Sequence, residues 1–157
     1  MKKFSFFLIF FISCVYSFKG FFPKELKSVG VEVFENESGR YGIEINVTNN
    51  FIKGFEEDRR TQIVEINKAS LVIRGKIKGF SKNPHSFDEN GRVLEYKILI
   101  DAEIEFINKI KNEEFLPKKI FSGWGIYSAL NEDEDIGIER ASRDLAKKVI
   151  TFLFSSW

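Results

Sequence analysis

Three carboxylates alternate along one stretch of the chain, and their spacing could support acid–base chemistry. Asp101, Glu103 and Glu105 lie two residues apart in the run EYKILIDAEIEF, residues 95–106. If this run forms a strand, the three carboxylates share one face at intervals of about 7 Å, within the range of paired glycosidase acids. An acid catalyst also needs an apolar pocket that raises its pKa, and alternating charges do not provide one. We therefore expect a solvated charged face and no enzyme activity.

Three cations alternate in the same way earlier in the chain. Arg74, Lys76 and Lys78 occupy every second position near the middle of SLVIRGKIKGF, residues 70–80. The simplest interpretation is that they form ion pairs across the sheet with the carboxylates of the acidic strand. The other interpretation is that clustered cations on a rigid strand bind the anionic oxygens of a phosphate group. The residues leave both interpretations open.

Metal, nucleophile and nucleic-acid chemistry have little support. His85 is the only histidine and Cys14 the only cysteine, so neither has a partner of its own kind for a metal site, a catalytic pair or a disulfide. Lys and Arg total 24 against 23 for Asp and Glu, so no overall field draws the chain to nucleic acid. We expect no cofactor, no metal and no nucleic-acid partner, and we interpret His85 as a loop residue.

Aromatic residues near the end of the chain are candidates for a protein interface. Trp124 lies between Gly123 and Gly125, and these glycines predict a bend or a close approach of the backbone. Large aromatic side chains concentrate binding energy at interfaces, although packing in the core is an equally good explanation for Trp124. Tyr127 and the last residue, Trp157, are further candidates of the same kind.

The chain opens with a segment typical of an export signal. Lys2 and Lys3 precede an apolar run at residues 4–13, and Cys14 follows directly. About ten apolar residues span roughly 15 Å as a helix, half of the roughly 30 Å hydrocarbon core, so a transmembrane helix is disfavoured. We predict a lipoprotein signal peptide at residues 1–13 and lipidation of Cys14, which would tether a domain at residues 14–157. A lone cysteine in an ordinary signal is the alternative.

The rest of the chain predicts one domain. Strands are expected at residues 28–34, 61–66, 70–80, 95–106 and 117–127, with turn-rich stretches at 81–91 and 111–114. A helix is expected at residues 41–57, where Ile43, Val47, Phe51 and Phe55 recur every four positions, and another after the acidic run at 131–135.

This order, β-α-β-β-β-β-α, predicts an α+β fold. We expect a single two-layer domain, with a mixed sheet of about four to five strands and two amphipathic helices packed on one face.

Four stretches of the chain resemble the LptE family of lipopolysaccharide-assembly lipoproteins, in the form found outside enteric bacteria. They are C-V-Y-S-F-K-G at residues 14–20, F-E-N at 34–36, F-S-G-W-G-I-Y at 121–127, and a closing helix that ends in S-W at 156–157. The resemblance spans nearly the whole mature chain, and F-S-G-W-G-I-Y after a charged strand is its most specific element. The chain departs from the family at Phe11, at Val15, and in a first helix poor in Ala and Leu.

The resemblance implies a domain lodged inside the outer-membrane β-barrel translocon LptD, as plug and assembly partner, with lipopolysaccharide as an expected ligand. It further implies a location at the cell outer membrane, through a lipid anchor at Cys14. Trp124, Tyr127 and Trp157 then become candidates for the barrel interface.

Under this hypothesis the basic row at Arg74, Lys76 and Lys78 is the candidate site for a glycolipid phosphate. Two other functions stay open. A freestanding, periplasm-facing lipid or glycolipid binder would need an apolar cavity between sheet and helices. A lipoprotein hydrolase would need two carboxylates that converge in a cleft.

Overall fold

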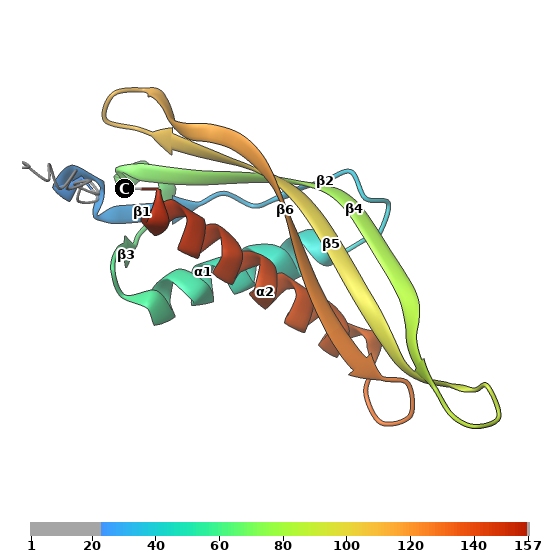
Figure 1. The fold of residues 1–157 in the computed structure, drawn as a ribbon. Coiled ribbons are helices and arrows are strands. Elements are labelled where there is room, and N and C mark those ends of the chain that lie inside the picture. Colours follow the sequence, from blue (N-terminus) through green and yellow to red (C-terminus); the bar gives the residue numbers. More distant parts are fainter. Residues whose placement is uncertain (1–22, 157) are drawn as a thin grey trace, which may run out of the picture.

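The computed structural model describes residues 23–156, which form one mixed sheet and two long helices (Figure 1). In chain order the elements are η1 (Lys24–Leu26), β1 (Ser28–Val31), β2 (Glu35–Asn36), α1 (Ile43–Asp58), β3 (Gln62–Ile63), η2 (Ile66–Lys68), β4 (Leu71–Phe87), β5 (Val93–Asn108), β6 (Glu113–Ser128) and α2 (Glu134–Ser155), where η marks a short 3-10 helix.

The sheet has six strands, in the spatial order β3-β1-β4-β5-β6, and β2 also pairs with β4. The short strands β1, β2 and β3 run parallel to their neighbours, whereas β4, β5 and β6 form an antiparallel meander. The predicted α+β fold with a mixed sheet is therefore confirmed. β2 was not predicted, because two residues are too few to show a period.

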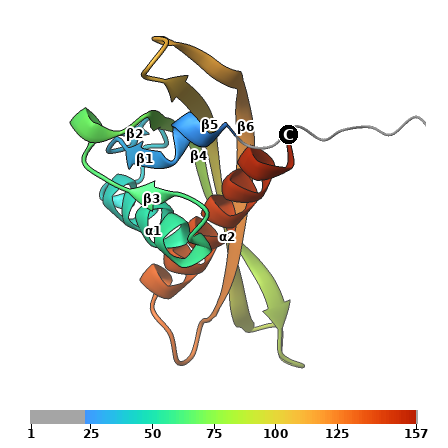
Figure 2. The ribbon, with the colours of Figure 1, turned by 90° about the vertical axis from the view of Figure 1, so that its left-hand side faces the viewer.

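Both helices cover the same face of the sheet (Figures 1 and 2). The predicted apolar stripe of α1, made of Ile43, Val47, Phe51 and Phe55, is confirmed, since each residue is at most 2% exposed. Each fully buried side chain of this size stabilises the fold by about 1.5–3 kcal/mol. The intrinsic helix propensity of α1 is weak, so this packing holds the helix in place.

The end of β4 differs from the prediction. The stretch at residues 81–91 is not a loop throughout, because β4 continues to Phe87 and Pro84 pairs with Tyr96 of β5. Proline is tolerated at an edge, and within residues 23–156 β5 is the only strand that pairs with β4 beyond Ile77. The turn itself is short: the Asp88 carboxylate accepts hydrogen bonds from the backbone N–H groups of Asn90 and Arg92.

The first strand is shorter than predicted. β1 ends at Val31, and Val33 is 68% exposed instead of packing with the two preceding valines. The chain leaves the β1 ladder here and rejoins the sheet as β2, next to a later part of β4. This shift places the acidic residues between β1 and α1 beside the cations of β4.

α2 packs closely against β6 because two glycines remove the side chains between them. A Cβ added at Gly123 would lie 2.3 Å from the Ala141 carbonyl oxygen, and one added at Gly125 would lie 2.6 Å from the Ala141 backbone nitrogen. The close backbone approach predicted for Gly123 and Gly125 is therefore confirmed.

Candidate functional site

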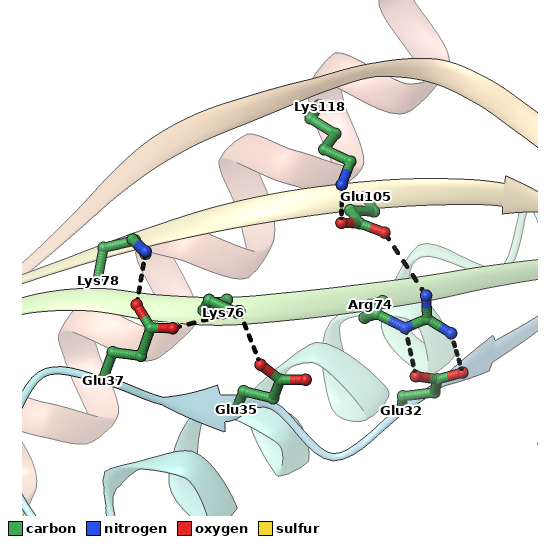
Figure 3. A network of polar contacts seen from close by, with 8 residues as sticks. All are labelled: Glu32, Glu35, Glu37, Arg74, Lys76, Lys78, Glu105 and Lys118. Atoms are coloured by element: carbon green, nitrogen blue, oxygen red, sulfur yellow. Dashed lines mark hydrogen bonds and ion pairs between the residues drawn. The ribbon is translucent and has the colours of Figure 1, made fainter.

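The sheet face away from the helices carries a network of ion pairs (Figure 3). At its centre, the Arg74 guanidinium donates two hydrogen bonds to the Glu32 carboxylate, at 2.7 and 3.1 Å, and also lies 3.6 Å from Glu105 of β5. The pairing with Glu105 is the cross-strand contact that the sequence predicts. The stronger pairing, with Glu32, comes from the segment that follows β1.

Lys76 and Lys78 do not pair with the acidic strand. Lys76 Nζ lies 3.0 Å from Glu35 and 3.2 Å from Glu37, and Lys78 Nζ lies 2.5 Å from Glu37. The prediction that all three cations pair with β5 is therefore wrong for these two. The physical reason is that β2 lies parallel to β4 and brings its own carboxylates nearer to the lysines.

These contacts shift the pKa values of the groups involved. Hydrogen bonds from Lys78 and then Lys76 lower the pKa of the Glu37 carboxyl group. The Glu32 carboxylate raises the pKa of Arg74, and the Glu35 carboxylate raises that of Lys76. With Lys118 paired to Glu105, the eight side chains in Figure 3 comprise four cations and four carboxylates. The network is therefore close to electroneutral, and each cation already has an anionic partner.

Two carboxylates of the acidic strand are already paired with other polar groups. Asp101 accepts a hydrogen bond from the Ser122 hydroxyl, and Glu105 lies between Arg74 and Lys118. A hollow of about 470 Å³ beside it is lined by Glu32, Glu35, Arg74, Gly75, Lys76, Glu103 and Glu105. This lining is charged apart from one glycine, so it does not supply the apolar surroundings that a catalytic acid requires.

Trp124, in β6, lies on the same sheet face, which the helices leave uncovered. It is 45% exposed, so the interpretation that it packs in the core is wrong. Its ring has the Lys97 ammonium group 5.1 Å from the centroid, and its backbone pairs with Leu99 of β5. Successive residues of a strand face opposite sides of the sheet. Because Gly123 and Gly125 face α2, the Trp124 side chain lies on the uncovered face.

The other predicted residues have different placements. Tyr127 is 4% exposed and stacks on Tyr96, so we leave it out of the proposed contact surface. Cys14 and Trp157 lie outside the described residues. His85 is an exposed residue of strand β4, not of a loop as expected. Within residues 23–156, no cluster of three or more His, Cys, Asp or Glu side chains could hold a metal ion.

Sequence reasoning missed the carboxylates of Glu32, Glu35 and Glu37. Their signal was present, since Glu35 and Glu37 alternate with the same period as Lys76 and Lys78. Matching the two rows, however, required knowledge that residues 35–36 pair with residues 76–77.

Comparison with known proteins decides the family. The model of the lipopolysaccharide-assembly family LptE matches residues 26–153, which include the whole sheet, all of α1 and all but the last two residues of α2. The chain belongs to the LptE family. This family assembles lipopolysaccharide and is not a family of enzymes. Among curated protein sequences, none matches this LptE-family chain.

Solved structures share the fold of this LptE-family chain at low sequence identity. A protein from Xanthomonas campestris has a TM-score of 0.58 and 9% identity, over 87% of this chain and 90% of its own. A minor lipoprotein from Acinetobacter baumannii has a TM-score of 0.53 and 11% identity, over 83% of this chain and 94% of its own. A chain of the PelC dodecamer from Paraburkholderia phytofirmans has a TM-score of 0.54 and 11% identity, over 83% of this chain and 90% of its own. In the described part of this LptE-family chain, neither helix is long and apolar enough to cross a membrane.

Proposed function

We propose that this chain is an outer-membrane lipoprotein that acts as plug and assembly partner of an LptD-type β-barrel and assists lipopolysaccharide insertion. The observation that carries the proposal is the LptE family match over residues 26–153. The anchor would be Cys14, lipidated after removal of the signal peptide at residues 1–13. A structural relative that is itself named a lipoprotein supports this part of the proposal.

The uncovered sheet face suits an enclosed position. Barrel interiors of the porin type are polar, so a domain held inside one should present a polar surface. The ion-pair network centred on Arg74 and Glu37 meets this requirement, because its charges are satisfied within the domain. Such a surface can lie against a polar wall without leaving an unpaired charge behind.

The position of the first described residues suits a tether. Eight residues lie between Cys14 and Pro23, and the nine Cα–Cα steps span about 30 Å when fully extended. A lipidated Cys14 would therefore hold the domain close to the membrane surface, where a barrel partner is accessible. η1 and the end of α2 lie at the same end of the molecule (Figure 1), which this tether would direct toward the membrane.

The space between sheet and helices is filled by side chains. Phe51, Phe55 and Phe106 are among the largest residues with no exposed surface, and they belong to one continuous apolar cluster. A freestanding lipid binder would need an apolar cavity in this layer. The filled core therefore supports the plug over the lipid binder.

A tagged full-length chain in its native host tests the proposal. We would solubilise the outer membrane gently and identify the proteins that co-purify in stoichiometric amount. An LptD-type barrel is the expected partner, and mass spectrometry of the mature N-terminus should find acylated Cys14. Recovery of abundant, folded chain without any barrel would contradict the plug and favour the freestanding binder. An unmodified N-terminus at another residue would contradict the anchor.

Two residue-level assignments remain predictions within this proposal. Trp124 is the proposed anchor of the barrel interface, since its ring is exposed on the uncovered face. Arg74, Lys76 and Lys78 are the proposed contacts for a glycolipid phosphate, and there the phosphate would have to replace carboxylates that already occupy the cations.

A further inference from the structure

Side chains of α2 occupy the outer edge of β6 at residues 122–126. β6 pairs with β5 on one side, and among the described residues no strand pairs with its other side. On that side, Arg140 Nη1 donates a hydrogen bond to the Ile126 carbonyl oxygen at 2.6 Å. Lys148 Nζ donates one to the Ser122 carbonyl oxygen at 2.8 Å. These carbonyl groups are ones that a neighbouring strand would otherwise use.

A third contact lies between these two. The Trp124 backbone N–H donates a hydrogen bond to Asp144 Oδ2 at 3.0 Å. Alternate residues of an antiparallel strand direct both backbone groups to the same side, so Ser122, Trp124 and Ile126 all face the edge. Cations meet the two carbonyl groups and a carboxylate meets the N–H, so each side chain has the polarity that its backbone partner requires.

The spacing of the helix matches the spacing of the strand. We call Arg140, Asp144 and Lys148 the edge stripe; they follow one another at intervals of four residues. Four helical residues advance about 6 Å. Two strand residues advance about 6.6 Å. Because α2 runs antiparallel to β6, each step along the helix therefore reaches the next edge-facing residue of the strand.

The edge stripe is not needed to build the core. The side chains of Arg140 and Lys148 are 47% and 42% exposed, and that of Asp144 is 28% exposed. The core contacts of α2 come from other positions, such as Ala141, Leu145 and Val149. The stripe therefore covers the edge of β6 from the border of the helix, while the neighbouring positions hold the helix on the sheet.

The part of β4 beyond Ile77 forms a second long edge of the sheet, and a proline there disfavours pairing with a further strand. In the described part of the chain, β4 beyond Ile77 has a neighbouring strand on one side only, and this stretch contains Pro84. Proline has no N–H to offer a further strand. Both long edges of the sheet thus carry features that oppose strand addition.

We propose that the edge stripe is an autoinhibitory contact that keeps β6 from pairing with β6 of a second copy of this chain. A strand edge presents the same row of groups in every copy, so two copies can pair antiparallel about a two-fold axis. By occupying the Ser122, Trp124 and Ile126 groups, α2 takes the place of that second copy. The inference is independent of the proposed barrel partner, because it uses contacts within the domain alone.

The test removes the stripe without disturbing the helix. The triple variant Arg140→Ala, Asp144→Ala, Lys148→Ala keeps good helix formers but cannot reach the strand. A matched control is Glu139→Ala, Arg143→Ala, Lys147→Ala, which removes one acid and two bases from the same helix one position earlier. Full-length chains would be purified in mild detergent and compared over the same concentration range by sedimentation velocity. We expect the protein mass to double for the stripe variant, while the wild type and the control stay monomeric.

Two further measurements tie any association to the strand edge. Ser122→Pro in the stripe variant removes an edge-facing N–H and leaves the ladder to β5 intact, so it should restore the monomer. Hydrogen exchange should find the Trp124 amide fast in the monomeric Asp144→Ala single variant and slow again in the dimer of the stripe variant. A stripe variant that stays folded and monomeric overturns the proposal, as does a dimer that survives Ser122→Pro. If the triple variant does not fold, the double variant Asp144→Ala, Lys148→Ala carries the same test, since it frees the edge-facing groups of Ser122 and Trp124. Its failure to associate at any concentration counts against the proposal.

Discussion

Gly123 of β6 lies directly against Ala141 of α2, with space for a hydrogen atom but not for a methyl group. A Cβ at Gly123 would stand 2.3 Å from the Ala141 carbonyl oxygen and 2.5 Å from the Leu145 Cβ. Neither neighbour can rotate away, since one is backbone and the other is the root of a buried side chain. This contact fixes the distance between the helix and the sheet.

Gly123→Ala should therefore destabilise the domain. We expect the free energy of unfolding to fall by about 1–3 kcal/mol, as for other overpacked cores, which thermal or urea unfolding would measure. Gly79→Ala in β4 is the matched control, because its nearest atom is the end of the Asp101 side chain, at 3.3 Å. Equal stability of the two variants would show that α2 can shift at no cost.

Trp124→Ala should separate partner binding from folding. Because the ring is 45% exposed, its removal should cost less stability than Gly123→Ala, yet it should lower the recovery of the barrel with the tagged chain. Tyr41→Ala serves as the control, since Tyr41 is 93% exposed and precedes α1. Undiminished barrel recovery with Trp124→Ala would remove this residue from the proposed interface.

The domain should lose stability in acid, in part through Glu37. Lys78 and Lys76 hold the pKa of this carboxyl group below its ordinary value of about 4.3. The folded state thus keeps Glu37 charged at pH values where the unfolded chain takes up a proton. Its contribution is fully present above the ordinary pKa and is lost as the pH falls through the lowered, folded-state value.

Urea unfolding from neutral pH down to pH values below the ordinary carboxyl pKa would measure this effect. Glu37→Gln should show a shallower decline than the wild type, because its side chain does not titrate. Glu114→Gln is a control, because among the described residues its carboxylate accepts a hydrogen bond from the exposed backbone N–H of Lys118 and lies in none of the lysine contacts of Glu37. Parallel curves for Glu37→Gln and the wild type would mean that the lysine contacts contribute nothing to stability.

Phosphate binding should improve when the competing carboxylates are removed. If Lys76 and Lys78 contact a glycolipid phosphate, the variant Glu35→Gln, Glu37→Gln frees both lysines and should bind lipopolysaccharide roughly twofold to fivefold more tightly. Asp101→Asn, Glu103→Gln removes the same charge from the same face without freeing either lysine. If both double variants gain the same affinity for lipopolysaccharide, the effect is due to overall charge and not to the freed lysines. No gain in either would argue against the site.

The sequence by itself determined the elements whose signal is local. The four-residue recurrence of Ile43, Val47, Phe51 and Phe55 predicted the buried face of α1, because a helix of 3.6 residues per turn places them on one stripe. Alternation along β4 and β5 likewise separated an apolar face from a charged one. These patterns depend only on the geometry of one element, so they can be read without knowing its neighbours.

The sequence was a poorer guide to where each strand ends and to which charged side chains form ion pairs. Pro84 suggested a loop, but it lies within β4 because the neighbouring strand ends earlier and leaves an edge. The carboxylates that hold Lys76 and Lys78 lie about forty residues earlier in the chain. The alternation of Glu35 and Glu37 is visible in the sequence, but only the parallel pairing of β2 with β4 brings these charges together, and a strand of two residues is too short to be predicted.

Trp124, in the motif at residues 121–127, shows what the sequence determines and what only the tertiary structure decides. The sequence determined that the Trp124 side chain lies on one face of the strand and that Gly123 and Gly125 face the other, since successive residues of a strand alternate between faces. It could not determine which face the helices cover. Tertiary structure decided that: α2 needs the closest approach, the glycines provide it, and Trp124 is left on the uncovered face with its backbone N–H bound to Asp144.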